Sequence, residues 1–181
     1  SKYPPGAPWL LGLGDRYGLA WLVTPLEGML GIAIVWLTVR RLLGAREGLV
    51  ALIAIGLAPL FAFEAASFYA HTASVMFLAI GFLGVATWTR TARTGWLVIV
   101  GAALGVAFLT RPIDALLFGV ALVSLRSWRA VIVPALAAIP FVALNLWYQA
   151  QQFGSPFTDG YRAYQPTMAA LYGGSSARPQ L

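Results

Sequence analysis

Apolar residues follow one another along the chain in six runs separated by short polar gaps. The runs cover residues 18–39, 48–63, 67–88, 95–110, 113–125 and 130–148. An α-helix rises about 1.5 Å per residue, so about 20 apolar residues cross a hydrocarbon core of about 30 Å. The fourth and fifth runs are too short to cross upright. The pattern predicts an all-α, polytopic transmembrane helical bundle with about six spans, some of them short.

Alternate gaps between the runs are rich in arginine. Residues 40–47, 89–94 and 126–129 together carry seven arginines and a single acid. Positively charged loops of membrane proteins face the cytoplasm. The sequence therefore predicts that these gaps are cytoplasmic. Both chain termini, residues 64–71 and residues 111–114 are then expected on the non-cytoplasmic side.

The composition changes after residue 148. Residues 149–181 are polar, rich in proline, glycine and aromatic residues, and contain no run long enough to span a membrane. Residues 153–157 predict a turn, and Tyr161 suits an interfacial aromatic belt. We therefore expect a transmembrane domain over residues 1–148 and an outer-face loop segment over 149–181.

Composition supports the membrane interpretation and excludes several functions. The chain is 60% hydrophobic and 10% charged, whereas soluble domains carry about 25% charged residues. Its net charge of +6 is dispersed over short gaps rather than gathered on one face, so nucleic acid is not an expected partner. The chain has no cysteine, which excludes disulfides and thiolate metal sites.

Two cations on the predicted outer side are candidate ligands for an anion. Lys2 precedes Pro4 and Pro5, which hold the backbone extended, so its ammonium could bind a lipid-linked phosphate as a point charge. The alternative is a lysine that only anchors the chain at the headgroups. Arg111 lies between two short runs, where it could bind an anion with two nitrogens. Its alternative is a salt bridge to Asp114.

Three further outer residues are candidates for lining a site. Asp114 follows Pro112 by two positions, which is typical of a helix start, so capping is its alternative role. Glu64 and His71 would share one face if residues 64–71 were helical, and such a pair could bind a divalent metal or move a proton. A solvated turn is the alternative, and the sequence predicts no metal site and no cofactor.

Four short segments carry a family resemblance. They are residues 2–6 (KYPPG), 67–72 (SFYAHT), 105–112 (GVAFLTRP) and 153–157 (FGSPF), the last followed by Gly160-Tyr161. In them the chain resembles the GT-C superfamily of membrane glycosyltransferases. Within this superfamily the segments resemble bacterial members of the dolichyl-phosphate-mannose protein mannosyltransferase and aminoarabinose transferase type.

The resemblance implies an integral protein of the bacterial inner membrane that moves a sugar from a polyprenyl-phosphate donor to an acceptor on the outer face. Lys2, with Tyr3 in the same motif, and Arg111 would then neutralise the phosphate of the leaving group. Glu64, His71, Asp114 and Tyr161 are possible lining residues. The acceptor and the catalytic base stay open.

The chain departs from the family pattern at its beginning. The resemblance implies an acidic motif upstream of the lysine segment, whose carboxylate acts as general base, and Asp15 is a poor substitute for it. We therefore expect either a fragment, which would be inactive alone if the missing carboxylate belongs to an upstream segment, or a chain with a processed N-terminus. A membrane transporter, a lipid-phosphate-binding subunit without catalysis and a structural subunit are the alternative functions.

Overall fold

The computed structural model describes residues 4–158, and this part of the chain contains helices but no strand. The prediction of an all-α fold is thus confirmed. The elements, in chain order, are α1 (Gly6–Asp15), α2 (Ala20–Leu42), α3 (Ala45–Gly56), α4 (Pro59–Ala65), α5 (Ala70–Thr91), α6 (Gly95–Thr110), α7 (Pro112–Ala121), the 3-10 helix η1 (Leu122–Leu125) and α8 (Trp128–Phe153).

Fewer helices than expected are long enough to span a membrane upright. Over the described residues, α2, α5 and α8 qualify by length and hydropathy, and the bent pair α3–α4 makes a fourth if it counts as one span. The fourth and fifth apolar runs form the shorter helices α6 and α7, the latter extended by η1. The expectation of about six spans is therefore corrected to three or four, accompanied by shorter apolar helices.

The run over residues 48–63 does not form one helix. The helix breaks after Gly56, and α4 starts at Pro59 with its axis bent by 67° from that of α3. Ala58 adopts φ −71° and ψ 115°, which is extended backbone. The cause is the proline ring, which disfavours the helical conformation of the residue before it.

Two helix boundaries differ from the sequence-based expectation. The segment Gly6–Asp15 forms the helix α1, which the six runs did not include. At the other end α8 continues to Phe153, five residues beyond the expected last run. It stops at Gly154, whose φ of +74° lies in the left-handed region that glycine adopts readily. The expected turn at residues 153–157 therefore starts where the helix ends.

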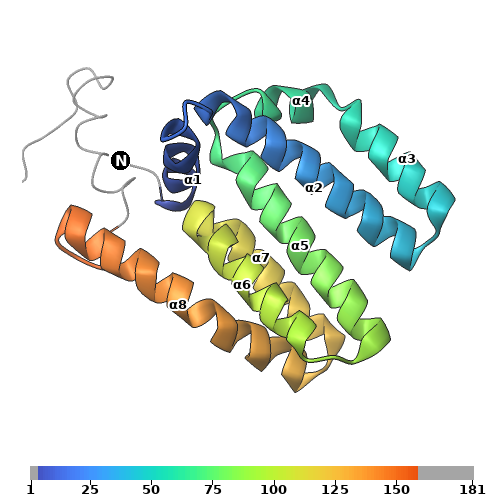
Figure 1. Cartoon of the computed structure of the whole chain (residues 1–181). Helices are drawn as coiled ribbons and strands as arrows, with labels where there is room; N and C mark the ends of the chain where they lie inside the picture. The colour runs from blue at the N-terminus through green and yellow to red at the C-terminus, as the bar shows by residue number, and fades with distance from the viewer. Residues whose placement is uncertain (1–3, 159–181) are drawn as a thin grey trace, which may run out of the picture.

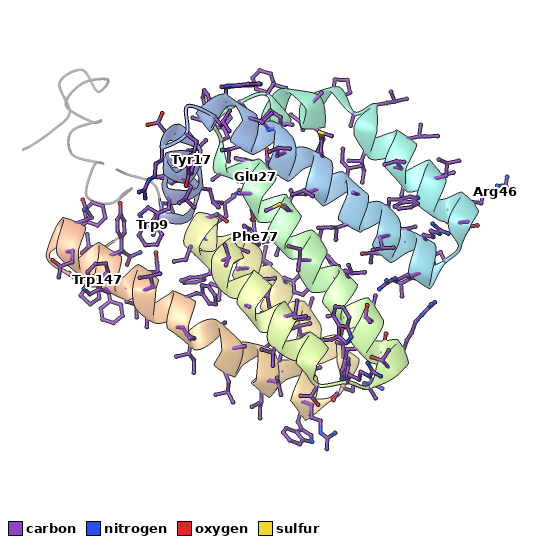
Figure 2. All side chains as sticks on the ribbon, viewed as in Figure 1. Trp9, Tyr17, Glu27, Arg46, Phe77 and Trp147 are labelled. Atoms are coloured by element: carbon purple, nitrogen blue, oxygen red, sulfur yellow. The ribbon has the colours of Figure 1, made fainter. Side chains whose placement is uncertain are left out.

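The chain runs back and forth between two ends of the bundle (Figure 1). The α2–α3, α5–α6 and η1–α8 connections lie at one end, and the seven arginines of the three predicted cytoplasmic gaps are in these connections or in the helix turns beside them. Helix α1, the α4–α5 link and the α6–α7 junction lie at the other. Figure 2 shows Arg46 at the first end and Trp9 and Tyr17 at the second. The arrangement matches the alternation inferred from charge.

Helix α6 is central and packs against α1, α5, α7 and α8. Val100 and Leu104 of α6 form a buried cluster with Phe118 and Leu122. Large apolar side chains, by contrast, are exposed along the outer faces of the long helices. In water this distribution would leave wide apolar patches uncovered. It suits a bundle whose outer surface contacts lipid.

Helix α8 approaches α6 closely at Gly101 and Gly105. A Cβ atom at Gly101 would lie 2.6 Å from Cβ of Ala137 and 2.7 Å from Cα of Pro134. At Gly105 the ring and Cβ of Phe141 occupy the same space. Glycine therefore permits the contact between α6 and α8, as small residues do in membrane helix pairs.

Replacing Gly101 by alanine is expected to destabilise the bundle by about 1–3 kcal/mol, because backbone atoms of α8 cannot move aside. The matched control is Gly119→Ala in α7, where a Cβ atom meets nothing within 4 Å. Helix propensity alone favours alanine there by about 1 kcal/mol. Thermal unfolding in detergent measures both. Equal melting temperatures for the two variants would contradict the packing described here.

Candidate functional site

A cavity of about 510 Å³ lies at the end of the bundle opposite the arginine-rich connections. Its volume falls within the range of small-molecule sites. The lining is mostly apolar, with a few polar side chains on the side of α5 and the α6–α7 junction. Its residues are Pro4, Ala7, Pro8 and Leu11 in or just before α1, Phe68, Tyr69, Ala70 and His71 at the start of α5, and Thr110, Arg111, Pro112 and Ile113 at the junction.

Helix α1 forms one wall because Gly6 lets it sit directly on the end of α6. A Cβ atom at Gly6 would lie 2.7 Å from the carbonyl carbon and oxygen of Leu109. Farther along the helix, Trp9 packs edge-on against Tyr148 of α8, with ring centroids 5.9 Å apart. These two contacts fix α1 across the ends of α6 and α8.

Arg111 lies at the α6–α7 junction because Pro112 follows it. Its backbone is extended, with φ −144° and ψ 91°, as expected for a residue before proline. That conformation ends α6 at Thr110, and α7 begins with Pro112 in its first position. The predicted helix start is thus confirmed.

The link between α4 and α5 sets the position of the opposite wall. The carbonyl oxygen of Glu64 accepts hydrogen bonds from the hydroxyls of Ser67, at 2.9 Å, and Thr72, at 3.1 Å. These bonds tie the end of α4 to the first turn of α5. They place Tyr69 and His71, whose rings contact edge-on with centroids 6.2 Å apart, at the cavity.

Arg111 has two partners in the described part of the chain. Its Nη1 lies 3.1 Å from Oδ2 of Asp114 and 3.1 Å from Nδ1 of His71. A guanidinium can only donate, so Nδ1 accepts this bond, and the proton of the neutral imidazole is assigned to Nε2. The alternative considered for Arg111, a salt bridge to Asp114, is therefore present.

That salt bridge leaves Arg111 available to a ligand. The side chains of Arg111 and Asp114 are 39% and 26% exposed, and ion pairs in such positions stabilise a protein by about 0–1 kcal/mol. An oxyanion in a cavity with apolar walls interacts more strongly, because less water screens the charges. The cavity therefore combines a cationic side with apolar walls.

Some residues that the sequence analysis considered for the site do not lie where a role in the site requires. Glu64 and His71 do not share a helical face, because α4 ends at Ala65 and α5 starts at Ala70. Glu64 does not line the cavity, and its buried Oε2 has no hydrogen-bond partner in the described residues. Asp15, at the end of α1, is exposed and outside the cavity. The condition for the Glu64–His71 pairing, a helix over residues 64–71, is therefore not met.

The N-terminal pair Lys2 and Tyr3, together with Tyr161, lies outside the described residues. Pro4, which follows Tyr3 directly in the sequence, is the first described residue and lines the cavity. The assignment of Lys2 and Tyr3 to the lipid phosphate, and of Tyr161 to the lining, stays a prediction.

Two residues that the sequence did not single out belong to the surroundings of Arg111. Thr110 is 1% exposed and lines the cavity. Ser74 is fully buried in α5 and donates a hydrogen bond to Oδ2 of Asp114 at 3.2 Å. Ser74 and Asp114 are 40 positions apart, and no local pattern relates two such residues.

Comparison with known proteins identifies the family. A family model described as dolichyl-phosphate-mannose-protein mannosyltransferase matches residues 2–148. The chain belongs to this family. The match covers α1 to α7 and most of α8, so it includes every residue that lines the cavity. No curated protein and no solved structure matches the chain significantly.

Membership of the mannosyltransferase family confirms the resemblance inferred from the four sequence segments. It implies a membrane glycosyltransferase that uses a polyprenyl-phosphate sugar donor. The apolar helices agree with an integral, multi-pass membrane protein.

Proposed function

We propose that the protein transfers a sugar from a polyprenyl-phosphate donor to an acceptor on the outer face of the membrane, and that the cavity holds the donor phosphate. The observation that carries this proposal is the placement of Arg111 and His71 beside apolar walls. A polyprenyl-phosphate sugar needs both features. Its phosphate requires a donor of hydrogen bonds, and its isoprene units require apolar contact.

The chemistry of transfer makes a cation at the phosphate useful. The acceptor oxygen attacks the anomeric carbon, and the bond from that carbon to the phosphate oxygen breaks. The electron pair leaves with the oxygen, so the phosphate gains one negative charge. Arg111 is positively charged at any physiological pH. A fixed cation that meets developing charge lowers the barrier of the reaction.

The acceptor hydroxyl must also lose a proton, and we assign this step to none of the described carboxylates. Asp114 is engaged by Arg111 and Ser74. The other four described carboxylates, those of Asp15, Glu27, Glu47 and Glu64, do not line the cavity. Lys2 and Tyr3, which precede Pro4 in the sequence, are proposed as further ligands of the phosphate.

The location of the cavity supports a reaction on the non-cytoplasmic side. The last turns of α2 and α5, with Arg40, Arg41 and Arg90, and the η1–α8 connection, with Arg126, are at the opposite end of the bundle. Arginine-rich membrane-flanking segments favour the cytoplasm. We therefore propose that the cavity opens toward the outer leaflet.

The test uses the full-length protein in right-side-out membrane vesicles with radiolabelled polyprenyl-phosphate sugars added from outside. We expect sugar transfer that excess unlabelled polyprenyl phosphate inhibits and the matching polyprenol does not. Movement of intact donor across the membrane without cleavage of the sugar–phosphate bond would instead support a transporter. Equal inhibition of sugar transfer by polyprenol and by polyprenyl phosphate would contradict a phosphate site.

A further inference from the structure

A series of side-chain contacts leads from the buried interior of α5 to the cavity. The hydroxyl of Ser74 donates to Oδ2 of Asp114 at 3.2 Å, and the same oxygen lies 3.1 Å from Nη1 of Arg111. Nη1 in turn lies 3.1 Å from Nδ1 of His71. Since His71 and Ser74 are three positions apart in α5, they lie on one side of that helix. Helix α5 therefore contacts Arg111 both directly and through Asp114.

The bond made by Ser74, like that of Thr72 to Glu64, leaves its own helix, whereas the other helical hydroxyls with a hydrogen bond in the described residues donate locally. Those of Thr38, Thr87 and Thr110 each donate to a carbonyl three or four positions earlier in their own helix. This local bond is the usual choice for a helical serine or threonine. Ser74 instead donates across the interface to α7, and full burial shields its hydroxyl from water.

The contacts of Arg111 occupy one part of its guanidinium. Nη1 carries two hydrogens and has two acceptors, Asp114 and His71. No acceptor in the described residues takes the hydrogens on Nη2 and Nε. These two nitrogens form the edge that binds two oxygens of a carboxylate or phosphate side by side.

We propose that Ser74 is a positioning residue that acts through Asp114 to hold the Arg111 guanidinium, which keeps the Nε–Nη2 edge for two oxygens of the donor phosphate. This inference rests on the proposed function. Asp114 is only one-quarter exposed, and the Ser74 hydroxyl fixes the rotation of its carboxylate. The anchored Oδ2 and the His71 ring then fix the plane of the guanidinium at two points.

The test is the variant Ser74→Ala of the full-length protein in nanodiscs of phosphatidylcholine. Polyprenyl phosphate and the matching polyprenol are the probes. We expect binding of the phosphate to weaken by about fivefold. The reason is that the Arg111 guanidinium is then no longer held in the orientation that binds the phosphate. Binding of polyprenol should not change, since it presents no phosphate to Arg111. A purely structural change in the cavity would weaken both ligands.

Two further variants make the test specific. Ser124→Ala removes a hydroxyl that donates to Ala121 of its own turn at the far end of the bundle, and it should leave both affinities unchanged. Ser74→Cys fills the same space with a weak donor. It should behave like Ser74→Ala, and it serves as the second variant if the alanine protein does not fold.

A double-mutant cycle with Arg111→Ala separates the two proposals. If Ser74 acts through Arg111, then Ser74→Ala has no further effect on phosphate binding in the Arg111→Ala protein. Unchanged phosphate binding in Arg111→Ala alone would overturn the proposed function. If Arg111→Ala does weaken phosphate binding, two results would overturn the positioning role of Ser74. One is unchanged phosphate affinity in Ser74→Ala. The other is a loss of affinity on Ser74→Ala that is as large in the Arg111→Ala protein as in the wild type.

Discussion

Replacing Arg111 by alanine is expected to weaken binding of polyprenyl phosphate by about 10–100-fold. Hydrogen bonds to charged groups are each worth about 1.5–3 kcal/mol, and a factor of ten corresponds to about 1.4 kcal/mol. Stability should change little, because the ion pair with Asp114 is partly exposed. Titration of the full-length protein in nanodiscs, followed by a melting curve, measures both quantities.

Arg111→Lys refines this prediction, because lysine keeps the positive charge but lacks the planar guanidinium with its two parallel hydrogen-bond donors. Its affinity should lie between those of wild type and Arg111→Ala. Arg46→Ala is the matched control, since Arg46 is exposed at the opposite end of the bundle (Figure 2). Wild-type affinity in Arg111→Ala, or an equal loss in Arg46→Ala, would contradict the phosphate site.

Replacing Gly6 by leucine is expected to disrupt the cavity wall formed by α1. Its Cβ atom would lie 2.7 Å from the backbone of Leu109 and 2.7 Å from Cγ2 of Thr110. Backbone atoms cannot rotate away, so α1 must lift from α6, at a cost of about 1–3 kcal/mol. We expect polyprenyl phosphate binding to fall by about tenfold or more, because α1 forms one wall of the cavity.

The matched control for this variant lies in the same helix. A Cβ atom at Gly12 would meet nothing within 4 Å, so Gly12→Leu should leave α1 in place and binding unchanged. Limited proteolysis and ligand titration of the two proteins provide the comparison. A similar affinity for both variants would show that docking of α1 on α6 does not shape the site.

The class of fold could be predicted from the sequence because membrane-spanning helices have a simple sequence pattern. Long apolar runs and arginine-rich gaps follow from the lack of water in the hydrocarbon core and from the charge bias of loops. Pro112 likewise indicated the α6–α7 junction, because proline restricts the residue before it. The same rule applied to Pro59 would have predicted the break between α3 and α4.

Other features depend on tertiary packing and had no local signal. Helix α1 has ten residues, so its apolar stretch was too short to count as a span. The contact between His71 and Arg111 joins residues 40 positions apart. Burial of the Ser74 hydroxyl depends on how α5 meets α7, so its bond to Asp114 follows from the fold alone.

The most direct test of the phosphate site is a cryo-EM structure of the full-length protein with polyprenyl phosphate bound. We predict that two phosphate oxygens lie about 3 Å from Nε and Nη2 of Arg111, with the isoprene chain along the apolar walls of the cavity. A phosphate bound elsewhere, beyond hydrogen-bonding distance of Arg111, would contradict this account.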